Sequence, residues 1–115
     1  MNKEAEGVLP EQHHLVEASD GALMAKAAAR AAERLGISKK DLAAIIPSGD
    51  RDSFEQATLF VRLQRVLDAW VGGNAKAAAS WLTSRNTALG GRPIDRMQSK
   101  EGLREVLSYL ESRGL

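Results

Sequence analysis

Apolar residues recur along most of this chain at three- and four-residue intervals, the spacing that places side chains on one face of an α-helix. The strongest stripe predicts a helix from about residue 54 to 71, whose apolar face contains Phe60, Leu63, Leu67 and Trp70. We expect this stripe to form the hydrophobic centre of one subunit. A bare helical dimerisation module, with the stripe as its seam, is the alternative.

A second stripe predicts a helix from about residue 20 to 35. Its members lie four residues apart: Leu23, Ala27, Ala31 and Leu35. The remaining helices are predicted from residues that cap or begin a helix: Ser38, Ser53, Asn74, Pro93 and Ser99. No segment is a convincing strand. The pattern therefore predicts an all-α fold, a compact bundle of about five to six helices.

Composition places few further limits on the chain. Its 115 residues suffice for one domain with a real core, and without cysteine it has no disulfide framework. No apolar run approaches the length of about 20 residues that crosses a bilayer, and the N-terminus lacks the apolar core of a signal peptide. We expect a cytoplasmic protein without a membrane partner, with residues 1–18 as a flexible N-terminal arm.

Motifs for catalysis or metal binding are absent from the sequence. His13 and His14 are adjacent, so on a helix they would point about 100° apart, which does not suit a metal site. The chain has neither a Gly-x-Ser-x-Gly elbow nor a Gly-rich phosphate loop. A net charge of +1 argues against nucleic-acid binding driven by bulk charge. We expect no enzyme activity, no metal and no cofactor, and a binding role instead.

The most informative segment is residues 81–95, where an apolar helix end leads into a polar turn, a glycine pair and a proline. This order predicts one specific non-helical connection between two helices, with Gly90, Gly91 and Pro93 as structural turn residues. The alternative is that Gly90-Gly91-Arg92 cradles an anion. Pro93 disfavours it, because proline lacks a backbone donor.

These residues resemble the Xre/MbcA/ParS toxin-binding domain. The resemblance is carried by Trp81-Leu82, Asn86-Thr87-Ala88-Leu89-Gly90-Gly91-Arg92-Pro93-Ile94-Asp95, Ser99-Lys100-Glu101-Gly102, Val106 and Leu110. It extends over about residues 58–113, and we assign residues 58–115 to this domain. The resemblance implies an antitoxin of a type II toxin–antitoxin system. Its partner would be a RES-type toxin that consumes NAD, with the C-terminal region blocking the toxin's active site, and the antitoxin would be a homodimer.

Candidate toxin contacts follow from this resemblance: Trp81, Arg85, Asn86, Leu89 and Arg92. Trp and Arg are enriched among interface anchors. Each candidate also has a structural alternative. Trp81 could belong to the core, and Asn86 could turn the backbone with Leu89 packed beneath it. Arg85 and Arg92 are harder to explain by packing, while Gly102 could permit close approach of a helix.

Residues 19–57 resemble part of an Xre-type helix-turn-helix, in the run Leu35-Gly36-Ile37-Ser38-Lys39-Lys40-Asp41-Leu42-Ala43. Many members of the family carry such an element, which represses the antitoxin's own operon. Here Ile46 is followed directly by Pro47, and about ten residues that would form the recognition helix are missing. The remaining candidates for DNA contact are Arg34, Lys39 and Lys40. A DNA-binding autoregulator of its operon is therefore the alternative function.

Overall fold

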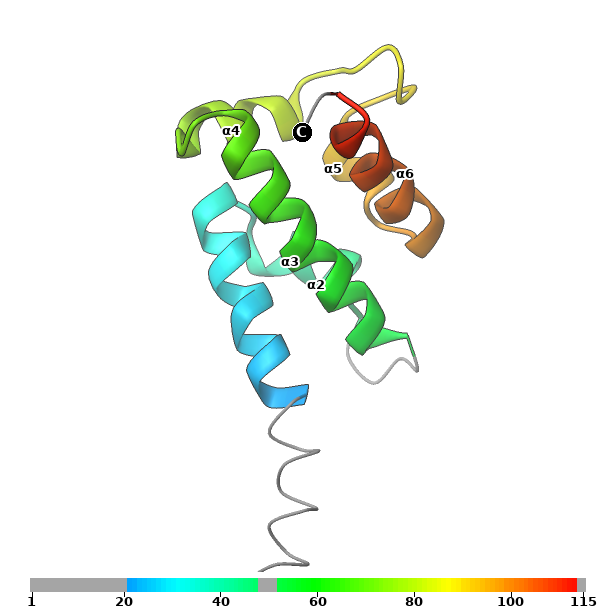
Figure 1. Ribbon diagram of the computed structural model, residues 1–115. Helices are drawn as coiled ribbons and strands as arrows, with labels where there is room; N and C mark the ends of the chain where they lie inside the picture. Colours follow the sequence, from blue (N-terminus) through cyan, green and yellow to red (C-terminus); the bar gives the residue numbers. More distant parts are fainter. Residues whose placement is uncertain (1–20, 48–51, 114–115) are drawn as a thin grey trace, which may run out of the picture.

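The computed structural model describes residues 21–47 and 52–113. Within these ranges the chain forms six helices and no strand, which confirms the predicted all-α bundle. The first helix covers residues 21–35. The others are α2 (Lys39–Ile45), α3 (Ser53–Trp70), α4 (Ala75–Thr83), α5 (Pro93–Arg96) and α6 (Lys100–Glu111) (Figure 1). The predicted arm, residues 1–18, lies outside the described residues.

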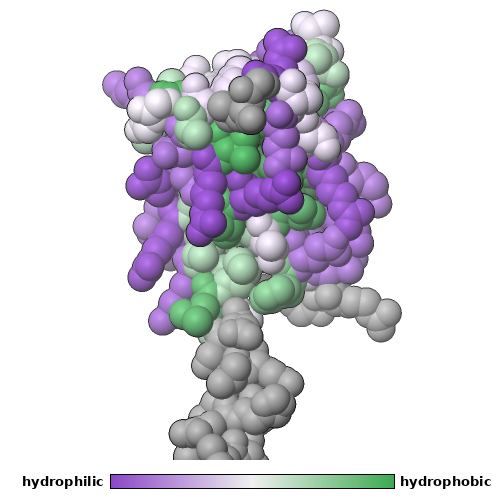
Figure 2. Space-filling view, viewed as in Figure 1, coloured by the Kyte–Doolittle hydropathy of each residue, from purple (hydrophilic) through white to green (hydrophobic). Residues whose placement is uncertain are grey.

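The core is centred on α3, which lies between the helix over residues 21–35 and α6 (Figure 1). Phe60, Leu63 and Leu67 are completely buried, as are Leu103, Val106 and Leu110 of α6. This part of the α3 stripe is thus the centre of one subunit and is not available as a dimer seam. On the face drawn in Figure 2, hydrophilic residues cover the outer edges and hydrophobic residues show between them.

Two members of the predicted stripes are more exposed than expected. Leu23 is 62% exposed, whereas Leu35 is buried. A row of residues spaced by four drifts about 40° around the helix at each step, so Leu23 points well away from Leu35. The buried face uses both three- and four-residue steps instead, through Ala28, Ala31, Ala32 and Leu35. Trp70, at the end of α3, remains 38% exposed.

Ion pairs at the edges of the α3–α6 contact fix the relative direction of the two helices. Glu55 pairs with Arg104, and Arg62 pairs with Glu111 at 2.6 Å, each across 49 residues of sequence. This constant separation means that the two helices run in the same direction.

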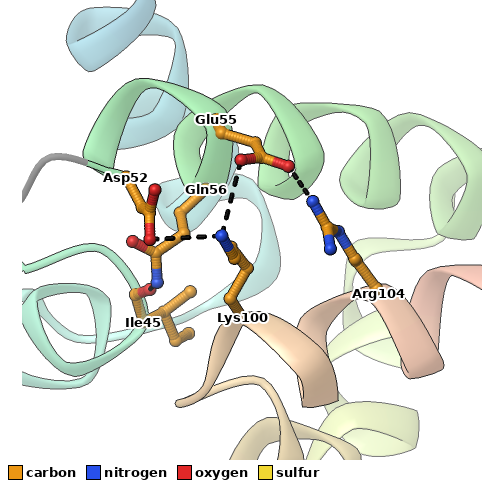
Figure 3. Close-up of polar contacts among 6 residues, drawn as sticks. All are labelled: Ile45, Asp52, Glu55, Gln56, Lys100 and Arg104. Carbon is orange, nitrogen blue, oxygen red and sulfur yellow. Dashed lines mark hydrogen bonds and ion pairs between the residues drawn. The ribbon is translucent and has the colours of Figure 1, made fainter.

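Lys100 reinforces the first of these contacts (Figure 3). Its Nζ lies 3.2 Å from Asp52 and 3.7 Å from Glu55. The hydrogen bond to Asp52 raises the pKa of Lys100 above its ordinary value. Because these groups are partly exposed, they orient the helices more than they stabilise them.

Three helices begin at the capping residues that the sequence predicts. Ser38 Oγ accepts from Asp41 N at 3.1 Å, Asn74 Oδ1 from Ala77 N at 3.0 Å, and Ser99 Oγ from Gly102 N at 3.0 Å. Pro93 occupies the first turn of α5, also as predicted.

The predicted cap at Ser53 is wrong. Asp52 is the N-cap of α3, and it makes no side-chain cap bond. Ser53 lies inside the helix, where its hydroxyl donates to the carbonyl of Pro47. Ser53 does not cap α3 because its hydroxyl bonds instead to a backbone carbonyl on the other side of the α2–α3 connection.

Gly102 is buried where α6 crosses the end of α5. A Cβ at this position would lie 1.7 Å from the carbonyl oxygen of Arg96 and 2.8 Å from its carbonyl carbon. Both atoms are backbone, so no rotamer change could relieve the overlap. Only glycine permits α6 to approach α5 this closely, as the sequence suggested.

We expect Gly102→Ala to lower the free energy of unfolding by about 2 kcal/mol or more, because the added methyl group overpacks the α5–α6 contact. Gly21→Ala is the matched control: it is also helical, and an added Cβ meets nothing within 4 Å. The control should be neutral or stabilising by up to about 1 kcal/mol. Urea denaturation followed by circular dichroism measures both. Equal stability of the two variants would contradict this account of Gly102.

Candidate functional site

The connection between α4 and α5 closes on itself through backbone hydrogen bonds. Asn86 N donates to Gly91 O at 2.9 Å, and Gly91 N donates back to Asn86 O at 3.2 Å. These two bonds form an isolated antiparallel bridge. Inside it, Leu89 N donates to Asn86 O at 3.2 Å and to Asn86 Oδ1 at 3.1 Å. The connection is therefore a closed loop with its own internal hydrogen bonds.

Two of the candidate contact residues hold this loop in place. Asn86 supplies the side-chain acceptor, and Leu89 is only 4% exposed, so it anchors the loop to the core. Gly90 has a φ of +77°, which favours glycine. Gly91 has no such φ, and an added Cβ there would meet nothing within 4 Å. Pro93 is buried in the first turn of α5.

The two candidate arginines lie in different electrostatic environments. Arg92 donates to both carboxylate oxygens of Asp95, through Nε at 2.9 Å and Nη2 at 3.0 Å. This hydrogen bonding holds the pKa of Asp95 below its ordinary value and raises the pKa of Arg92. Arg85 is exposed and forms no hydrogen bond or ion pair with any residue that the structure describes. Arg85 is thus the arginine available to a partner without loss of an internal bond.

Trp81 is partly buried in a row of three aromatic rings, which we call the aromatic row: Trp70, Trp81 and Tyr109. Trp81 meets Trp70 edge to face, with centroids 6.0 Å apart and planes at 74°. It stacks on Tyr109 at 6.2 Å and 22°. The guanidinium carbon of Arg113 lies 5.1 Å from the Tyr109 ring centre. The hydrophobic pattern predicts Trp70 as part of the core. Tyr109 and Arg113 were not among the predicted contacts, although two residues spaced by four could have indicated a pair at the end of the last helix.

A surface hollow of about 540 Å³ lies beside the loop, between Gly90 and Glu105. Two ion pairs line it, Arg92–Asp95 and Arg96–Glu105. Its cations are therefore already matched by carboxylates, which does not favour the alternative that Gly90-Gly91-Arg92 cradles an anion.

The DNA-contact candidates lie on the other half of the molecule. Arg34 pairs with Asp68 at 3.2 Å, and Lys39 and Lys40 are exposed in the first turn of α2. Only seven residues separate the end of α2 at Ile45 from the start of α3, and α3 buries its apolar face in the core. These positions do not add support to DNA binding.

Residues 21–47 and 52–113 contain no group of three or more His, Asp or Glu side chains that could hold a metal ion. His13 and His14 lie outside these ranges. No helix in the described part of the chain has both the length and the apolar content that a membrane span requires.

Residues 66–113 match the model of a family described as the antitoxin Xre/MbcA/ParS C-terminal toxin-binding domain. Over these residues the chain is similar to that family's toxin-binding domain. The toxin-binding domain begins within α3 and includes α4, the closed loop, α5 and α6. No curated protein matched the chain.

The toxin-binding domain therefore contains all five candidate contacts and the whole aromatic row. The helix over residues 21–35, α2 and the first part of α3 precede the match. Because Phe60 and Leu63 lie before residue 66 and are completely buried, the domain shares its core with the N-terminal half.

We expect Asn86→Ala to lower the free energy of unfolding by about 1 kcal/mol, because it removes the side-chain acceptor for Leu89 N. Asn86→Asp is the control, since its carboxylate keeps an oxygen at the same place. Chemical denaturation should find the aspartate variant closer to the unsubstituted protein. If the alanine variant were as stable as the aspartate variant, the Asn86 side chain would not hold the loop.

The Arg92–Asp95 pair predicts the titration of Asp95. Its carboxyl should titrate below the ordinary aspartate pKa of about 3.9 because the guanidinium stabilises the ionised form. The contribution of the pair to stability is present above the ordinary pKa and is lost as the pH falls through the lowered one. Carbon-13 NMR of the carboxyl group measures the midpoint. Arg92→Gln should raise it, and an unchanged midpoint would contradict the pairing.

Proposed function

We propose that this chain is the antitoxin of a type II toxin–antitoxin system, which neutralises a RES-type, NAD-consuming toxin by direct binding that blocks the toxin's active site. The observation that carries the proposal is the toxin-binding domain at residues 66–113. In this proposal the antitoxin acts as a cytoplasmic homodimer and has no catalytic role of its own.

The closed loop supports a binding role because its conformation is set before a partner arrives. The paired hydrogen bonds between Asn86 and Gly91, together with buried Leu89, hold the backbone in one arrangement. A preorganised surface loses less conformational entropy when it binds. We assign Asn86 and Leu89 to positioning the loop, and Trp81, Arg85 and Arg92 to the toxin contact.

The charges around the loop indicate the chemistry of the toxin surface. Between residues 69 and 94 the only charged residues are Lys76, Arg85 and Arg92, and all three are basic. Arg92 is already paired with Asp95, whereas Arg85 is exposed and unpaired within the described residues. A carboxylate on the toxin would therefore meet Arg85 without displacing an internal partner.

Coexpression with the protein encoded by the adjacent gene tests the proposed function. Cells that express the neighbour alone should lose NAD and stop growing, and coexpression of this chain should restore both. A neighbour that is harmless when expressed alone would contradict the proposal.

We expect Arg85→Glu to weaken binding to that neighbouring protein at least about tenfold, which corresponds to about 1.4 kcal/mol, because it places a carboxylate against a carboxylate. Its thermal unfolding should match that of the unsubstituted chain, since Arg85 makes no internal bond. Arg30→Glu is the matched control, because Arg30 is also an exposed arginine and lies on the helix over residues 21–35. Isothermal titration calorimetry measures the affinities. Equal binding by the two variants would remove Arg85 from the interface.

A further inference from the structure

The aromatic row lies where the ends of three helices meet. Trp70 is the last residue of α3, Trp81 lies in the last turn of α4, and Tyr109 lies near the end of α6. Figure 1 shows these ends together, at the opposite end of the bundle from the start of α3. The chain has two Trp and one Tyr, and all three are in this row.

The aromatic row is only partly buried in the hydrophobic core. Trp81 and Tyr109 pack against the core and are partly buried, while Trp70 is 38% exposed. The centre of the bundle is filled instead by residues such as Phe60 and Leu103, which are completely buried. Trp70 is therefore exposed next to Trp81 and Tyr109, which each keep part of their surface accessible to solvent. Trp, Tyr and Arg are the residues most enriched in the energetically dominant part of protein interfaces.

The charge around the row is not balanced. Arg113 lies over the Tyr109 ring, and neither Arg113 nor Arg85 forms an ion pair with a described residue. The acidic residues nearest to the row in sequence already have basic partners, since Asp68 pairs with Arg34 and Glu111 with Arg62. The surface therefore combines partly exposed aromatic residues with the guanidinium of Arg113, which has no acidic partner among the described residues.

We propose that the toxin-binding interface extends from the closed loop over the aromatic row and Arg113, and that it docks an apolar patch flanked by carboxylates on the toxin. This inference rests on the proposed function and adds the chemical character of the partner surface. The rings bury apolar area, and Arg113 and Arg85 pair with the carboxylates. A second copy of this chain is the competing occupant, and the experiments below separate the two.

The first experiment measures binding of the full chain to the protein encoded by the adjacent gene. Trp70→Ala and Arg113→Glu should each weaken binding at least about tenfold. Phe54→Ala is the matched control for the ring, because Phe54 is 54% exposed and lies in the first turn of the same helix, at its opposite end. It should bind like the unsubstituted chain. Added salt should weaken binding of the unsubstituted chain more than binding of Arg113→Glu.

A second experiment needs no substitution. The chain is labelled with 5-fluorotryptophan, which reports only on Trp70 and Trp81, and is titrated with the unlabelled partner. Both fluorine resonances should shift on binding. This result would support the inference even if Trp70→Ala failed to fold.

Three results would overturn the inference. If the unsubstituted chain does not bind the neighbouring protein, the proposed function fails as well. If it binds while both variants bind equally well and the fluorine signals stay in place, the function stands and the row is outside the interface. If Trp70→Ala converts a dimer to a monomer in sedimentation without weakening toxin binding, the row is a contact between two copies of this chain.

Discussion

The parallel contact between α3 and α6 determines where every other part of the toxin-binding domain lies. The two helices bury Leu63 and Leu67 on one side and Val106 and Leu110 on the other, and all four are completely inaccessible to solvent. Burial of apolar side chains drives this contact. The ion pairs at 49-residue separation then select the direction and register of the two helices. With that register set, the C-terminal ends of α3 and α6 come together.

Gly102 has a similar role at the other end of α6. Because it lacks a Cβ, α6 can lie against the carbonyl of Arg96, which brings α5 and the loop before it close to the core. Leu89, which is buried, then anchors the loop to the core. The loop is exposed but is held at both ends by packed elements, so its rigidity comes from the core and not from the loop alone.

The sequence predicted those features that depend on neighbours along the chain. Ser38, Asn74 and Ser99 cap helices as expected, because capping needs only a side chain three residues before an amide. The predicted cap at Ser53 was wrong because its hydroxyl donates to the carbonyl of Pro47. No pattern along the chain predicts that acceptor. The aromatic row could not be predicted from the sequence for the same reason. Its rings come from three helices and meet only after α3, α4 and α6 have packed.

The two ends of the α3–α6 pair differ in how their charges are satisfied, and this difference has a functional consequence. At the N-terminal ends, Glu55 and Lys100 belong to a network in which each charge has an opposite partner. A partner that docked there would have to desolvate matched pairs, which is costly. At the C-terminal ends, Arg113 lies over the Tyr109 ring, and Arg85 follows Trp81 by four residues in the sequence. Neither arginine has a carboxylate partner among the described residues. Asp68 and Glu111 at this end are paired with Arg34 and Arg62, but a partner that contacts Arg85, Arg113 and the rings need not break those pairs, so the cost of association is lower there. The distribution of ion pairs therefore favours the C-terminal ends of α3 and α6 as the surface that a partner meets.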